Sequence, residues 1–81
     1  MYPVIDAEGT LEIVTDDFGT FGYATQPGSD KLYVSLKQIQ SLGLKPGDYL
    51  RGKVRPPRQD ELYHSFVLIE EVNGRAVQAA L

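Results

Sequence analysis

The sequence contains no cysteine, and this absence excludes disulfide bonds, cysteine-ligated zinc and thiol catalysis. Its single histidine, His64, has no second histidine or cysteine with which to share a metal ion or a proton. A Walker-type glycine-rich phosphate loop is also missing, so nucleotide hydrolysis is not expected. Together these absences predict a chain that is not an enzyme and that uses no metal or cofactor.

Neither a membrane span nor an export signal is indicated. No apolar run approaches the roughly 20 residues that cross a bilayer. Residues 1–6 lack the basic start and the apolar stretch of a signal peptide. Because no cysteine pattern points to an oxidising compartment, we expect a cytoplasmic location and no membrane partner.

A basic excess is missing as well, since 8 Lys and Arg stand against 11 Asp and Glu, for a net charge of −3. Nucleic-acid binders usually carry positive charge, because phosphate contacts supply much of their affinity. An acidic chain that binds nucleic acid must therefore gather its positive charge locally or rely on contacts other than phosphates.

The sequence does contain a series of short strand patterns bounded by turn residues. A chain of 81 residues makes one domain, near the lower size at which a core is self-sufficient. Strands are expected at residues 10–14, 18–24, 31–34, 49–54 and 63–69, the last continuing weakly to 72. We expect residues 1–8 and 75–81 to be terminal extensions, the second of which could instead form a final strand.

One short helix is predicted between the third and fourth strands. Ser35 can cap it, and Gln38 lies three residues later, as in a capping box. Gly43 is placed to end it. Its apolar stripe consists of Leu36, Ile39 and Leu42. Five strands with this one helix are the order of an all-β, five-stranded OB-fold or cold-shock-like barrel.

Five aromatic residues fall on or beside the second, third and fifth expected strands. They are Phe18, Phe21, Tyr23, Tyr33 and Tyr63. Exposed rings are platforms on which bases stack, for roughly 1–3 kcal/mol each. The alternative is that the rings fill the core. Phe21 and Tyr23 share one face of their strand, however, and Phe18 the other, and a small barrel cannot bury both faces.

A basic cluster follows on the fourth strand and in the loop after it. Arg51, Lys53, Arg55 and Arg58 hold half of the 8 Lys and Arg within eight positions. Such a cluster is either a phosphate track beside the rings or a solvated strand edge. The residues alone leave both interpretations open.

The order of these motifs resembles the RNA-binding domain of the transcription termination factor Rho family. The matching segments are residues 9–13, 16–19, 32–35, 38–39, 44–48, 52–57, 61–63 and 71–73. The most specific part is Gly-Lys-Val-Arg-Pro-Pro at 52–57 followed by Glu-Leu-Tyr at 61–63. A small barrel has no generic need for that string.

The resemblance implies a cold-shock-like domain that takes short, pyrimidine-rich single-stranded RNA, preferably containing cytosine. In that family a separate hexameric motor hydrolyses ATP, and no such motor is encoded in this chain. Phe18 matches the family's first stacking phenylalanine, and Tyr33 matches the tyrosine after the following loop. Glu61 and Tyr63 match the pair that helps to form the base pocket. A glutamate can accept a hydrogen bond from the amino group of cytosine, which uracil lacks.

The chain departs from the family motif Asp-Gly-Phe-Gly-Phe-Leu-Arg in the second strand. Without a gap, Thr20 and Gly22 replace the second phenylalanine and the arginine. With one inserted residue, Phe21 recovers the phenylalanine and Tyr23 stands in place of the arginine. Lys31 also stands where the family tends to carry an acid. Two alternatives follow: a diverged or engineered barrel whose RNA binding is weak or lost, and a protein-interaction module.

Overall fold

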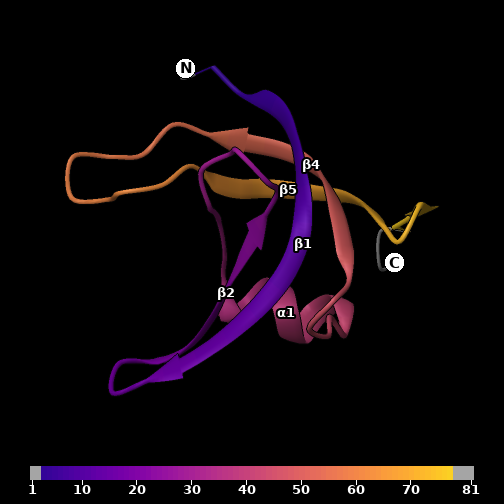
Figure 1. The fold of residues 1–81 in the computed structure, drawn as a ribbon, viewed down its shortest axis with the longest axis horizontal. Coiled ribbons are helices and arrows are strands. Elements are labelled where there is room, and N and C mark those ends of the chain that lie inside the picture. Colours follow the sequence, from indigo (N-terminus) through magenta and orange to yellow (C-terminus); the bar gives the residue numbers. More distant parts are fainter. Residues whose placement is uncertain (1–2, 78–81) are drawn as a thin grey trace.

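The chain folds into a strongly curved sheet, with one helix closing an end of it (Figure 1). The structure is a computed structural model that describes residues 3–77. Its elements are β1 (Ile5–Asp16), β2 (Gly19–Thr25), β3 (Leu32–Val34), α1 (Leu36–Leu42), β4 (Tyr49–Arg55), β5 (Ser65–Val72) and β6 (Arg75–Ala76). No helix in this described part is long and apolar enough to span a bilayer.

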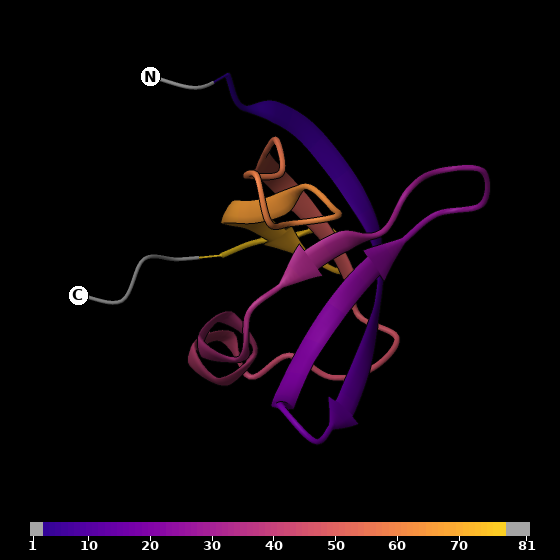
Figure 2. The same cartoon turned by 90° about the vertical axis from the view of Figure 1, so that its left-hand side faces the viewer.

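The sheet closes on itself through the long, bent strand β1. The first half of β1 pairs antiparallel with β4, and its second half pairs antiparallel with β2. On the far side, β3 pairs with β2 and makes one parallel bridge to β5, between Tyr33 and Ser65. Figure 2 shows β2 and β3 in front, with α1 below β3 and to the left of β2. The predicted all-β, OB-like barrel with a helix between the third and fourth strands is confirmed.

The terminal extensions differ from the prediction. β1 begins at Ile5, so residues 5–8 belong to the sheet and are held by the ladder to β4. They were missed because alternation is weak there: Ile5 is exposed and Ala7 only half-buried. At the other end, Arg75–Ala76 forms β6 against β5. Residues 78–81 lie outside the described part of the chain.

The helix begins and ends where the sequence predicts. The Ser35 side chain accepts a hydrogen bond from the Gln38 backbone N–H, at 3.2 Å, while the Gln38 side chain accepts one from the Ser35 N–H, at 3.0 Å. Gly43 ends the helix with a φ of 60°, which glycine adopts without strain. The Gln38 side-chain amide also donates to the Phe66 carbonyl at 3.0 Å, tying the cap to β5.

The core lies inside the barrel and under α1. Its buried hydrophobic residues are Leu11, Ala24, Val34, Ile39, Leu44, Leu50, Val54, Phe66 and Ile69. Opposite β5, the register of β4 shifts between Arg51 and Gly52. A methyl group at Gly52 would overlap the Leu68 carbonyl oxygen and lie 3.0 Å from the Ile69 Cα. The missing side chain therefore lets two backbones approach and the barrel wall bend.

Candidate nucleic-acid interface

The pleat of β2 turns two aromatic rings outward. Gly22 and Ala24 are buried, so Phe21 and Tyr23, which alternate with them, face away from the core. The neighbouring strand β3 places Tyr33 directly opposite Tyr23. The predicted sharing of one face by Phe21 and Tyr23 is confirmed.

Barrel closure adds a fourth ring. The Tyr33 backbone N–H donates to the His64 carbonyl at 2.8 Å, which brings the loop before β5 alongside β3. Tyr63 then packs edge-to-face on Tyr23, with ring centroids 5.5 Å apart. Phe21 lies 5.4 Å from Tyr23 and 6.0 Å from Tyr33 by the same measure. We call Phe21, Tyr23, Tyr33 and Tyr63 the aromatic cluster.

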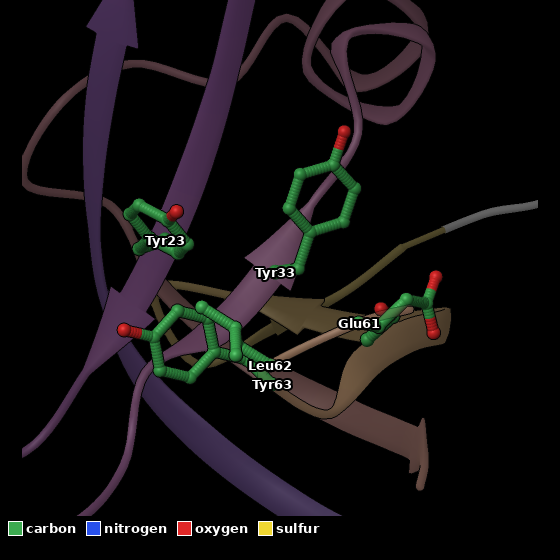
Figure 3. Close-up of a pocket in the computed structure, with 6 residues that line it drawn as sticks. Tyr23, Tyr33, Glu61, Leu62 and Tyr63 are labelled. Atoms are coloured by element: carbon green, nitrogen blue, oxygen red, sulfur yellow. The ribbon is translucent and has the colours of Figure 1, made fainter. Parts of the chain in front are cut away.

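A pocket of about 290 Å³ opens on this cluster. It is lined by Tyr23, Tyr33, Glu61, Leu62, Tyr63 and Ser65. Figure 3 shows Tyr23 and Tyr63 at one side of the pocket and the Glu61 carboxylate at the other, with Tyr33 on the neighbouring strand. The volume lies at the lower end of the roughly 300–1,000 Å³ range of small-molecule sites. The pocket therefore suits one flat, partly polar ring.

The loop between β4 and β5 fixes the Glu61 carboxylate. Its Oε1 accepts hydrogen bonds from the Arg55 guanidinium at 2.7 Å and from the Arg58 backbone N–H at 2.8 Å. Its Oε2 accepts a second bond from Arg55 at 3.0 Å. Arg55 also donates to the Pro56 carbonyl at 3.0 Å. Such a two-pronged arginine–carboxylate pair holds both groups in a defined orientation.

These contacts also fix the charge of Glu61. The hydrogen bond from Arg55, followed by that from the Arg58 backbone, lowers the pKa of the Glu61 carboxyl to about 2. The carboxylate is therefore ionised across the physiological range and can only accept hydrogen bonds. Among residues 3–77, no three histidine or acidic side chains are grouped to hold a metal ion.

Arg55 does not take the place expected for an RNA contact. Its side chain is 11% exposed and is engaged by Glu61, because the loop folds back over the end of β4. Arg55 therefore holds in place Glu61, a residue that lines the pocket. Arg58 is exposed, and only its backbone is tied to Glu61, so a direct RNA contact by its side chain stays a prediction.

The rest of the basic face of β4 is paired with acids. The Arg51 guanidinium lies 3.7 Å from the Glu8 carboxylate and 3.9 Å from that of Glu71. Lys53 pairs with Asp6 of β1. This pairing raises the pKa of Lys53 and lowers that of Asp6. The paired charges favour a solvated charged face over a phosphate track on β4, which lies between β1 and β5 in the sheet.

Phe18 lies apart from the aromatic cluster. It occupies the turn between β1 and β2, where its N–H donates to the Asp16 carboxylate at 2.8 Å, and its side chain is 97% exposed. Tyr23 is five residues further along, or about 16 Å at the rise of an extended strand. Since Tyr63 packs on Tyr23 near the other end of β2, the expected flanking of one base by Phe18 and Tyr63 stays a prediction.

The structure adds three residues that the sequence analysis did not place at the site. Leu62 is 84% exposed and lines the pocket. Ser65 is buried and also lines the pocket. Leu62 lies between Glu61 and Tyr63 in the sequence, and only this position could have indicated that it lines the pocket. The Lys31 ammonium sits 4.9 Å above the centroid of the Tyr23 ring.

Comparison with known proteins agrees with this geometry. The family model described as the Rho termination factor, RNA-binding domain, matches residues 7–78. The chain belongs to this Rho RNA-binding domain family. The match covers β1 from Ala7 onward, every later strand of the described part of the chain, the helix, and the loop that carries Glu61.

Individual relatives give the same result. The chain is 38% identical over 77 residues to transcription termination factor Rho of Bacillus subtilis, covering 90% of this chain and 18% of that protein. It is 40% identical over 72 residues to Rho of Escherichia coli K12, covering 85% of this chain and 17% of the relative. Rho of Buchnera aphidicola matches to the same extent. The chain thus spans less than a fifth of the length of these relatives.

Proposed function

We propose that this domain binds single-stranded RNA, with one pyrimidine base in the pocket beside the aromatic cluster. The observation that carries the proposal is the convergence of Tyr23, Tyr33 and Tyr63 with an oriented carboxylate in one open pocket. Because the relatives are transcription termination factors, the natural ligand is expected to be a transcript.

The rings supply most of the contact. Tyr33 is 37% exposed and Tyr63 is half-buried. Each side chain therefore offers part of its ring to a ligand, while its buried part packs against the protein. Stacking on such rings is tolerant of base identity and contributes about 1–3 kcal/mol per base. This contribution does not depend on phosphate charge, so a chain with a net charge of −3 can still bind RNA through its rings. A pocket of about 290 Å³ has room for one base.

Glu61 supplies the preference for cytosine. Each carboxylate oxygen can accept two hydrogen bonds, and Oε2 accepts one, from Arg55. The remaining position accepts the amino group of cytosine, whereas uracil presents a carbonyl oxygen that the carboxylate repels. Because Arg55 holds Glu61 ionised and oriented, the site is organised before the base arrives.

The test is to compare oligocytidine and oligouridine binding to the wild type, Glu61→Gln and Asp60→Asn. Asp60 is exposed in the same loop, so its variant removes an equal charge away from the pocket. Matched base-edge contacts discriminate by roughly 1–3 kcal/mol, so we expect about a 5- to 150-fold preference for cytosine in the wild type and in Asp60→Asn. Glu61→Gln should lose most of it.

The possible failures of this test are separable. Binding of neither oligonucleotide by the wild type would refute RNA binding altogether. Equal binding of both would leave RNA binding standing and refute the base preference. An unchanged preference in Glu61→Gln would remove Glu61 from the recognition of the base.

A further inference from the structure

Lys31 is a cation held over Tyr23, one of the rings that line the pocket, and no acidic side chain in the described part of the chain is paired with it. It directly precedes β3, the strand that carries Tyr33, and its ammonium lies over the face of Tyr23. Within residues 3–77, none of the four ion pairs includes Lys31. By contrast Arg51, Lys53 and Arg55 are each paired with a carboxylate.

The ring beneath Lys31 fixes its position. Tyr23 is surrounded by Phe21, Tyr33 and Tyr63 in edge-on contacts, with centroid distances between 5.4 and 6.5 Å. A cation over a tyrosine face is attracted by the negative potential of the ring. The ammonium is therefore directed toward the aromatic cluster, where a nucleotide would lie, and its three N–H donors remain available.

Acidic side chains lie around Lys31, so its positive charge changes the electrostatic potential that an RNA backbone would meet. Glu12 lies directly across from Tyr23 on β1 and is exposed, and Asp30 is exposed beside Lys31. Without Lys31 these carboxylates would present a negative border to an RNA backbone. The charge of Glu61 is already balanced by Arg55. Lysine is a compact point charge that suits a phosphate group better than the edge of a base.

We infer that Lys31 binds a backbone phosphate of the nucleotide whose base occupies the pocket. This inference rests on the proposed RNA binding, and it assigns the electrostatic part of that binding to one side chain. The rings and Glu61 then select the base, while Lys31 fixes the position of the strand without reading its sequence.

The experiment measures how the affinity for a short oligocytidine depends on salt in four proteins: wild type, Lys31→Met, Lys31→Arg and Lys45→Met. Methionine keeps the length of the side chain and removes the charge, and arginine keeps the charge. Lys45 is exposed in the turn between α1 and β4, outside the residues that line the pocket, so its variant controls for net charge. Thermal unfolding of each variant verifies that it is folded.

One phosphate contact to a single strand contributes about 0.7 to the slope of log affinity against log salt. Lys31→Met should therefore flatten the slope by about 0.7, so that raising salt from about 50 to about 200 mM weakens it about 2.6-fold less than wild type. Lys31→Arg and Lys45→Met should keep the wild-type slope, and the preference for cytosine over uracil should survive in all four proteins.

Two results would overturn the inference while leaving RNA binding intact. If Lys31→Met binds more weakly by the same factor at every salt concentration, Lys31 only packs on Tyr23. If it changes the cytosine preference at an unchanged slope, Lys31 contacts the base. Failure of the wild type to bind oligocytidine would instead refute the proposed function, and this inference with it.

Discussion

Replacing Gly52 by alanine should destabilise the barrel far more than the same change at Gly22. The three atoms nearest to a methyl group at Gly52 would all be backbone: it would overlap the Leu68 carbonyl oxygen and lie 3.0 Å from the Ile69 Cα. At Gly22 its closest neighbour would be the end of the Leu11 side chain, at 2.8 Å, and the nearest backbone atom, the Glu12 carbonyl oxygen, would lie at 3.2 Å. A side chain can change rotamer, whereas a paired strand can move only with its ladder.

The magnitudes follow from this contrast. Overpacking costs about 1–3 kcal/mol, and a clash with backbone belongs at the upper end, while the lost freedom of the unfolded chain returns about 0.4–1 kcal/mol. We expect a net loss of about 2–3 kcal/mol for Gly52→Ala and at most about 1 kcal/mol for Gly22→Ala. A domain of 81 residues has about 4–12 kcal/mol in total.

The assay is thermal unfolding followed by circular dichroism, with urea unfolding as a second measure. At about 4–8 °C per kcal/mol, Gly52→Ala should lower the melting temperature by about 8–24 °C and Gly22→Ala by no more than about 8 °C. Equal shifts in the two variants would refute the argument that the identity of the neighbouring atom, backbone or side chain, decides the cost. A larger decrease in melting temperature for Gly22→Ala than for Gly52→Ala would show that the clash with side chains costs more than the clash with backbone.

Three further predictions concern the site. Tyr63→Leu should weaken oligocytidine binding by about 1–3 kcal/mol in a fluorescence titration, and unchanged affinity would show that its ring does not stack on a base. Because Glu61 has a pKa of about 2 when folded and 4.5 ordinarily, its ionic contribution to stability is complete above pH 4.5 and declines toward pH 2. The difference in melting temperature between wild type and Glu61→Gln should shrink over that interval, and a difference independent of pH would contradict the assignment. Phe18→Ser should leave the melting temperature unchanged, since the side chain is 97% exposed, and should weaken binding only of strands long enough to extend from the pocket to the turn. Equal weakening for a dinucleotide would show that Phe18 reaches the pocket.

Local signals in the sequence were sufficient for much of the fold. Ser35 and Gln38 specify the start of α1 through contacts three residues apart, and the alternation of β2 puts Phe21 and Tyr23 on one face, although it does not say which face points outward. Such features depend on neighbours along the chain, so periodicity and capping rules detect them.

The differences from the expected arrangement arise where the chain turns back on itself, over six residues at Arg55 and Glu61 and over three at Asp16 and Gly19. Arg55 alternates with Lys53 just as an exposed residue would, yet Glu61 folds over it and removes it from the surface. Phe18 resembles a strand residue, but the pairing of Asp16 with Gly19 leaves it at the tip of a tight turn. No spacing rule along a single strand contains either contact.

The single bridge between Tyr33 and Ser65 gives the barrel a seam, and the pocket straddles it. Tyr33 belongs to one side of the seam, and Tyr63 and Ser65 belong to the other. In the binding mode proposed above, a base held between them would link the two sides, so the ligand would bind the closed barrel and not one opened at this point. Its affinity is then reduced by whatever fraction of molecules is open, and its presence lowers that fraction. RNA binding and closure of the barrel would thus be thermodynamically coupled.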